Sequence, residues 1–303
     1  MVWPALATRA KAGVMKSFRL GLLALIAGLV AVGAAQARPP VWIVRGGDSE
    51  VVLFGSVHLL PPGLDWRPPA LEQAIKRADD VWFELPIDPA TESETLRLAT
   101  ELGALPPDQS LFKLLPRADA ERLLKVARAY GADPAALDRF KPWLAEVALS
   151  GAAYRRAGAE GQDGVEKAVA AEVPATAARR AFETPREQIA ILAGEPMDQQ
   201  IASLRQTVKE MEDEPDEFAV LVRAWMAGDL KAIDREALKP LRKASPSLFQ
   251  HLVTDRNARW TAALDQRLKG HGRAVVVVGM AHLVGPDGVP ARLRALGYRV
   301  EGP

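Results

Sequence analysis

The chain has 303 residues, of which 49% are hydrophobic and 25% are charged. This composition is typical of a globular protein that is long enough for one large domain or two. Lys and Arg number 39 against 38 Asp and Glu, so the formal net charge is +1. A balanced charge without long basic runs leaves no electrostatic case for nucleic acid as a partner. The chain has no cysteine, so its core alone must stabilise it.

Residues 1–37 have the order of a secretory signal peptide. A short basic region at residues 15–19 precedes an apolar stretch at residues 20–31, and Ala-Gln-Ala at residues 35–37 is a small-residue cleavage site. We therefore expect a periplasmic or secreted protein whose mature part, residues 38–303, is a single domain without a stable membrane span. Met15 is an alternative first residue of the translated chain. An uncleaved anchor is the competing interpretation, because the apolar stretch approaches the length of a bilayer span.

A hairpin is expected at the start of the mature chain. Residues 41–46 (Val-Trp-Ile-Val-Arg-Gly) are typical of one arm of a hairpin, Gly47-Asp48 is a turn signal, and residues 50–54 supply the partner strand.

A G-x-x-H motif that follows a short apolar run occurs twice in the sequence. It ends once at His58, after the apolar residues 51–54, and once at His282, after residues 275–278. A short continuous apolar run is typical of a strand that is buried on both faces, and we expect the glycine to end each strand. Ligands bind at the carboxyl ends of such strands. Two of only four histidines share this setting, which makes them the leading candidates for a site.

The similarity between the two copies continues past the histidines. A proline-opened helix at residues 68–78 and a strand at residues 81–83 precede Glu84, and residues 289–301 repeat that order. Two strand–helix–strand units of this kind predict a mixed α/β fold with a central mixed or parallel sheet. Glu84 leaves the same sheet edge as His58, which favours a place in the site over a solvated loop.

Residues from about 107 to 240 are rich in alanine and leucine and give few strand signals. This pattern predicts a largely helical region that covers the sheet. A helix that Pro134 opens is interrupted at Lys141-Pro142-Trp143, where we expect a kink or a new helix start.

Three further polar residues are candidates for the site. Glu183 directly precedes a capping box, so it is either a solvated loop acid or a third acid at the sheet edge. Arg256 and Asn257 fall on the apolar stripe of a helix. A charged group on a buried face needs partners. Arg256 and Asn257 therefore form either a structural ion pair or part of a polar site.

Two histidines and a glutamate are ordinary ligands for divalent Zn, Mn, Fe or Co. His58, His282 and Glu84 would leave open metal positions at which the metal can generate hydroxide or polarise a carbonyl. A metal-free alternative uses histidine and glutamate as a general acid and base pair.

The sequence resembles the TraB/GumN family, which includes the Tiki-type metalloproteases, over residues 42–302. The resemblance rests on Gly55-Ser56-Val57-His58-Leu59, Phe83-Glu84, Lys141-Pro142-Trp143, Phe182-Glu183-Thr184 with Gln188, Arg256-Asn257 with Trp260, and Gly279-Met280-Ala281-His282-Leu283. It implies that His58 and His282 are the paired metal-associated histidines and that Glu84 is their acidic partner. It also implies that Arg256 and Asn257 are polar site residues. Tiki-like members are similar to divalent-metal-dependent peptidases, whereas this exported chain looks closer to the GumN-like bacterial branch.

These observations predict an exported metal-dependent hydrolase, most similar to a peptidase, that acts on a peptide or envelope substrate. In this hypothesis Arg256 stabilises the developing oxyanion, and Glu183 or another acid moves the proton. Two alternatives stay open: a non-enzymatic envelope protein that binds a metal or haem, and an accessory protein of a polysaccharide system.

Overall fold

A computed structural model describes residues 38–159 and 164–303, and Arg38–Pro303 form one compact unit. The predicted signal peptide at residues 1–37 lies outside the described residues.

The described chain begins with the expected hairpin. Strand β1 (Val41–Gly46) pairs with β2 (Ser49–Ser56) in an antiparallel register that sets Val41 opposite Phe54. Gly47 takes a positive φ of 56° in the turn, a conformation that glycine adopts without steric cost. The prediction that Gly55 ends the second strand is wrong, because β2 continues through it to Ser56.

Six strands of the described residues form one sheet in the order β4-β3-β5-β2-β1-β6. The other four are β3 (Asp80–Phe83), β4 (Ala178–Ala181), β5 (Gly272–Gly279) and β6 (Arg299–Glu301). Strands β4, β3, β5 and β2 run parallel, whereas β1 is antiparallel to both β2 and β6. The predicted mixed α/β class is therefore confirmed. Because β5 lies between β2 and β3, the two strands of the first strand–helix–strand unit are not neighbours.

Helices make up most of the remaining chain. Those before β4 are α1 (Pro69–Lys76), α2 (Pro89–Gly103), α3 (Leu111–Leu114), α4 (Arg117–Tyr130), α5 (Pro134–Leu137), α6 (Pro142–Arg156) and α7 (Val165–Glu172). Those between β4 and β5 are α8 (Pro185–Ala193), α9 (Met197–Asp213), α10 (Glu217–Ala227), α11 (Leu230–Ile233), α12 (Lys239–Ala244), α13 (Pro246–Phe249) and α14 (Asp255–Leu268), with π-helical turns η1 (Asp234–Leu238) and η2 (Gln250–Thr254). The 3₁₀ turn η3 (Met280–Leu283) and α15 (Val289–Ala295) follow β5. In residues 38–159 and 164–303, no helix combines the length and apolar content needed to cross a bilayer.

The break expected at residues 141–143 is present as a new helix start. Helix α5 ends at Leu137, and α6 begins at Pro142 with Pro in its first position, where a missing N–H costs nothing.

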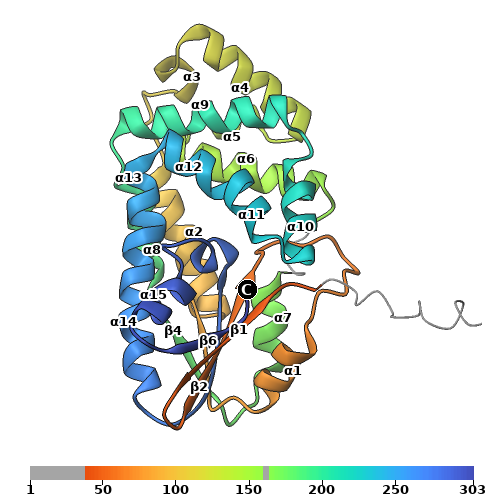
Figure 1. The fold of residues 1–303 in the computed structure, drawn as a ribbon. Helices are drawn as coiled ribbons and strands as arrows, with labels where there is room; N and C mark the ends of the chain where they lie inside the picture. Colours follow the sequence, from red (N-terminus) through yellow and green to blue (C-terminus); the bar gives the residue numbers. More distant parts are fainter. Residues whose placement is uncertain (1–37, 160–163) are drawn as a thin grey trace, which may run out of the picture. The chain divides into compact units, whose positions relative to one another are not determined.

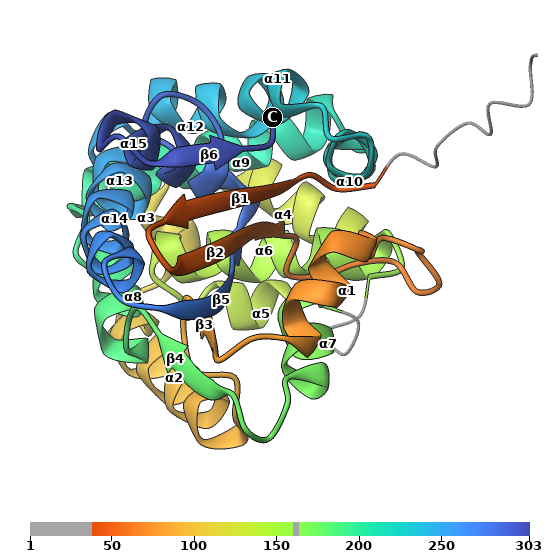
Figure 2. The same cartoon turned by 60° about the horizontal axis from the view of Figure 1, so that its bottom comes forward.

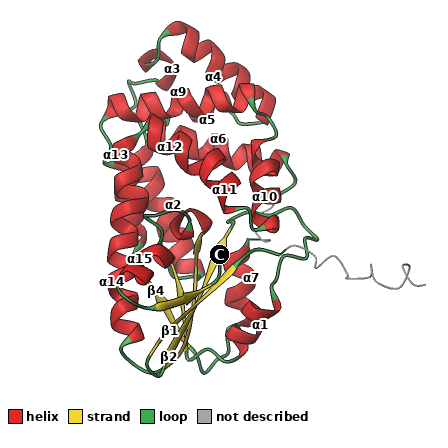
Figure 3. Ribbon diagram, viewed as in Figure 1, coloured by secondary structure: helices red, strands yellow, loops and turns green. Residues whose placement is uncertain are grey.

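Helices cover both faces of the sheet. Figure 2 shows α1 and α7 on one side of the strands and α14 and α15 on the other. Helices α3, α4 and α9 lie on the far side of α6 from the sheet (Figures 1 and 3). This outer layer has an apolar cluster of its own, which includes Leu111, Leu123, Leu149 and Leu204.

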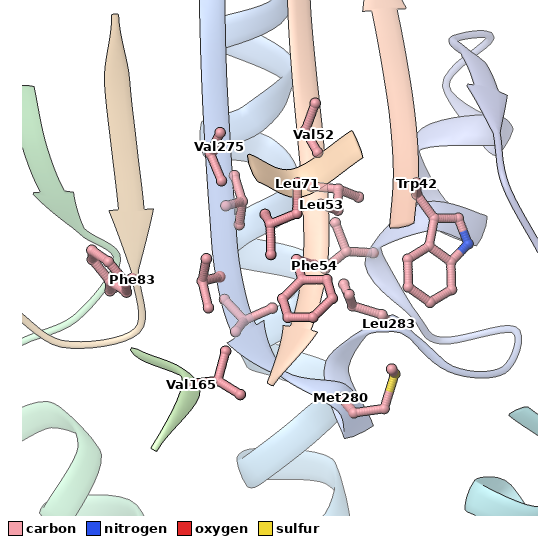
Figure 4. Close-up of a cluster of buried hydrophobic side chains, with 14 of the residues drawn as sticks. Trp42, Val52, Leu53, Phe54, Leu71, Phe83, Val165, Val275, Met280 and Leu283 are labelled. Carbon is pink, nitrogen blue, oxygen red and sulfur yellow. The ribbon is translucent and has the colours of Figure 1, made fainter. Parts of the chain in front are cut away.

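The main core surrounds β2 and β5. Phe54, Val275 and Leu71 are among its buried side chains, and Met280 and Leu283 extend it past the end of β5 (Figure 4). Continuous burial along both strands is what a parallel sheet with two covered faces requires.

Gly55 allows this end of the core to close tightly. A Cβ at this position would lie 2.6 Å from Met280 Sδ and 3.0 Å from Met280 Cα. Because Ser56 pairs with Gly279 across the parallel ladder, the chain leaves both strands at the same level of the sheet, and His58 and His282 follow.

Gly55→Ala should lower the free energy of unfolding by about 1–3 kcal/mol, because the added methyl group overpacks the contact with Met280. Urea denaturation measures the loss. In a Met280→Ala background the same substitution should cost less, since part of the clash is gone. Equal unfolding midpoints for the wild type and Gly55→Ala would contradict this packing.

Candidate functional site

The polar side chains of the site follow the carboxyl ends of the parallel strands. His58 comes two residues after β2, and His282 lies in the 3₁₀ turn after β5. The pairing of β3 with β4 continues beyond both strands, since Glu183 N donates to the backbone oxygen of Glu84 at 3.0 Å. Strand ends at one sheet edge thus supply four of the predicted site residues.

The side chains of His58, His282 and Glu84 meet around Gly279. Its N–H donates to Glu84 Oε1 at 2.7 Å. A Cβ on Gly279 would lie 3.2 Å from that oxygen and 3.7 Å from both His58 Nε2 and His282 Cδ2. The structure therefore brings His58, His282 and Glu84 together, as the sequence predicts, and a glycine provides the space between them.

Arg256, the second residue of α14, connects the buried members of the site. Its Nη2 donates to Glu84 Oε2 at 2.6 Å and lies 2.9 Å from Glu183 Oε2. Its Nη1 donates to Leu252 O at 3.1 Å and to His282 Nε2 at 3.0 Å, and its Nε donates to Glu183. Only 3% of the side chain is exposed. Each guanidinium nitrogen has a partner among the described residues, so Arg256 orients its neighbours. Its role as the oxyanion ligand stays a prediction.

His282 is held as a neutral ring of one tautomer. Asn257 Nδ2 donates to Asp287 O at 2.9 Å, which leaves Asn257 Oδ1 to accept from His282 Nδ1 at 2.7 Å. The Nε2 atom then carries the lone pair that accepts from Arg256. Burial, together with the nearby charge of Arg256, lowers the pKa of His282 to about 4. The ring centroid lies 4.4 Å from that of Trp260.

His58 is the accessible member of the site, with 66% of its side chain exposed. Its Nδ1 donates to Glu166 Oε1 at 2.6 Å, and Ser56 Oγ donates to the same oxygen at 2.6 Å. The carboxylate of Glu166 raises the pKa of His58 to about 9. Because Nδ1 is engaged, Nε2 is the ring nitrogen that faces Glu84 and Gly279.

Glu84 is ionised. Burial disfavours its charged form, but His282, Arg256 and His58 and the N–H of Gly279 outweigh that effect and lower its pKa to about 2. Gln188 Nε2 adds a donor to Oε2 at 3.2 Å.

Glu183 is a buried site-edge acid, not a solvated loop residue, since 3% of its side chain is exposed. Its Oε1 also accepts from Trp260 Nε1 at 3.1 Å and from Arg259 Nη2 at 3.2 Å. Glu183 contacts Arg256 rather than either histidine, so within these contacts it orients and balances the guanidinium. Both interpretations of Arg256 therefore hold, because the ion pair and the polar site are the same cluster.

The three predicted metal ligands do not form a ready-made ligand set. Among residues 38–159 and 164–303, no group of three or more His, Cys, Asp or Glu side chains is arranged to hold an ion. Arg256 donates to both His282 Nε2 and Glu84 Oε2, two of the atoms that would have to bind the ion. Metal binding stays a prediction.

Sequence reasoning missed Glu166, the residue in closest contact with His58. Glu166 lies in the first turn of α7, where an acidic residue is common because it interacts favourably with the helix dipole. Because this position has an ordinary explanation, the sequence gives no sign of the hydrogen bond with His58, which forms only in the tertiary structure.

Comparison with known families places this site in context. The family model described as the TraB/PrgY/gumN family matches residues 40–302. The chain belongs to the TraB/PrgY/gumN family. The match includes every site residue described above.

Among curated proteins, the chain is similar to the uncharacterized protein YbaP of Escherichia coli (strain K12). The two are 23% identical over 257 residues, which cover 84% of this chain and 92% of YbaP.

Arg256→Met should destabilise the protein by about 3–5 kcal/mol, because Glu84 and Glu183 would stay buried without their shared cation. Arg259→Met is the matched control. Arg259 also contacts Glu183, but its side chain is 57% exposed, so its loss should cost within about 1 kcal/mol. Urea unfolding compares the two variants, and equal losses would contradict the central role of Arg256.

The pKa values of the two histidines should be displaced in opposite directions from that of a free imidazole. Nitrogen NMR of the imidazoles should show His282 with a proton on Nδ1 alone from about pH 5 to 8, and His58 doubly protonated over most of that range. As pH falls from 6.5 towards 4, the unfolded chain gains a proton at His282 that the folded protein does not, so this residue lowers stability there. An ordinary titration of His282 near pH 6.5 would contradict its assigned neutral state.

Proposed function

We propose that this TraB/PrgY/gumN protein is a metal-dependent hydrolase, peptidase-like in its chemistry, which cleaves a substrate bound over His58. One observation carries the proposal: two imidazoles, each oriented through its Nδ1, meet the carboxylate of Glu84 around Gly279. As a metal ligand His58 must be neutral. The three carboxylates of Glu84, Glu166 and Glu183 then face two guanidinium groups, those of Arg256 and Arg259, which leaves one negative charge in excess. Surplus negative charge beside an imidazole nitrogen that has given up its proton is the environment that favours a cation.

The outer contacts of the histidines support this interpretation. Metal-binding histidines usually donate their second ring N–H to a carboxylate, carbonyl oxygen or water, which fixes the ring and its tautomer. His58 donates to Glu166 and His282 to the side-chain carbonyl of Asn257. Both rings therefore present Nε2 to the Glu84 side of the site.

Nε2 of the two histidines and the carboxylate of Glu84 would hold the divalent ion, with Arg256 giving up its hydrogen bond to His282. When bound, a divalent ion lowers the pKa of water and polarises a carbonyl.

The protein's own residues have separable roles in this proposal. His58, accessible and joined to Glu166, would hold the ion through Nε2 at the exposed side of the site. In the metal-free alternative the same nitrogen would exchange a proton with the reacting groups. Arg256 and Asn257 are positioning residues, because they act through Glu84 and His282. Glu183 holds Arg256.

We also propose that the protein works outside the cytoplasm after cleavage behind Ala37. The support is the order of basic, apolar and small residues at positions 15–37. A periplasmic or secreted site would give the enzyme access to peptide or envelope substrates.

His58→Ala should remove bound divalent metal and lower turnover by about 100-fold or more, while the unfolding midpoint changes little because the side chain is exposed. Elemental analysis, a peptide-library cleavage assay and urea denaturation measure the three quantities. His271→Ala replaces another exposed histidine and should change none of them.

Retained activity after exhaustive chelation would contradict the metal-dependent mechanism and leave the metal-free acid and base pair. Metal or haem retained without any turnover would instead favour a carrier.

A further inference from the structure

A cavity of about 370 Å³ adjoins the candidate site. Its walls come mainly from α6, α8, α9 and the segment from α12 to η2. Leu59 and Leu252 also line it. Leu59 follows His58 in the chain, and the carbonyl oxygen of Leu252 accepts from Arg256. Leu59 and Leu252 therefore connect the cavity to the candidate site.

The walls hold an unusual concentration of buried polar atoms without partners. Five buried side-chain atoms of the described residues lack a hydrogen bond, and four of them belong to residues that line this cavity. They are Trp143 Nε1, Glu195 Oε2, Gln200 Oε1 and Ser245 Oγ. All four residues are at most 8% exposed. Buried polar groups are normally satisfied, since an unpaired one is costly, so these atoms are available to a ligand that fills the cavity once the side chains of its walls adjust.

The charge of the lining restricts that ligand. Its charged residues, within the part of the chain that the structure describes, are Glu146 and Glu195, with no cation among them. Burial raises the pKa of Glu146, whose Oε1 accepts from Ser203 and Thr207. Glu195 Oε1 faces His251 Nδ1 at 3.0 Å. An anionic group would enter without a counter-charge and is disfavoured.

The remaining lining is largely apolar, with Leu59, Leu192, Leu241, Leu248 and Leu252 among its residues. A mostly apolar cavity with a few placed polar groups is the usual form of a small-ligand site.

We propose that this cavity is the subsite that binds an uncharged, apolar residue of a peptide substrate together with its flanking amide groups. Trp143 Nε1 would donate to a substrate carbonyl oxygen. Gln200 Oε1 and Glu195 Oε2 would accept from substrate N–H groups, and the Ser245 hydroxyl can do either. The assignment of the ligand as part of a substrate rests on the proposed hydrolase function.

Gly151 offers a way to fill the cavity without disturbing its walls. It lies within α6 and lines the cavity, and a Cβ there would meet only Arg155 Nη1, at 3.4 Å. Gly151→Leu should therefore fold, because leucine is also a better helix former than glycine. Gly151→Ala is the matched control, which adds one methyl group and leaves most of the cavity open. Val147→Trp, at a position 47% exposed on the same helix, is a second blocking variant.

The test is calorimetric titration with N-acetyl-leucinamide and N-acetyl-phenylalaninamide, compared with the amide of N-acetyl-aspartate. The wild-type protein and Gly151→Ala should bind the apolar probes and not the acidic one. Gly151→Leu and Val147→Trp should weaken that binding by about tenfold or more. Urea denaturation confirms that each variant is folded. No binding of the apolar probes, or binding that both blocking variants leave unchanged, would overturn the proposal.

The same titration on His58→Ala separates this inference from the proposed function. If the wild-type protein cleaves no peptide while both it and His58→Ala bind the apolar probes, the result would support the cavity and contradict the hydrolase. Peptide cleavage whose KM both blocking variants leave unchanged would support the hydrolase and contradict the subsite.

Discussion

The site depends on one buried positive charge. The guanidinium of Arg256 connects Glu84, Glu183 and His282, which come from the ends of three different strands. Removing a single partner from such a cluster leaves an uncompensated buried charge, so the cluster is stable only as a whole. Arg256 lies on α14, which packs against the sheet, so the ends of the three strands must lie within reach of this helix.

The sheet explains why these residues can share one cation. Strands β3, β5 and β4 are parallel and adjacent in register, so their carboxyl ends reach the same edge. Glycine at position 279 then allows close approach, because a side chain there would fill the space between Glu84 and the two histidines. His58 lies at the exposed side of this arrangement, next to an apolar cavity.

Much of the site could be predicted because strand periodicity and a repeated motif are local signals. His58, His282 and Glu84 were each placed by an apolar run that ends beside them. The insertion of β5 between β2 and β3 could not be predicted, since strand order depends on contacts between distant segments. Glu166 was missed for a related reason. Its position at a helix start has an ordinary explanation, and its bond to His58 spans 108 residues.

Charge balance connects the fold to the proposed chemistry, because the carboxylates around Arg256 and His58 exceed the fixed positive charge. A divalent ion at Nε2 of His58 would balance that excess and complete a hydrolytic site. Anomalous diffraction from crystals soaked in Mn²⁺ tests this claim most directly. The account predicts a peak within about 2.3 Å of His58 Nε2, on the side that faces Glu84. A Mn²⁺ peak elsewhere, or no peak at that position, would contradict it.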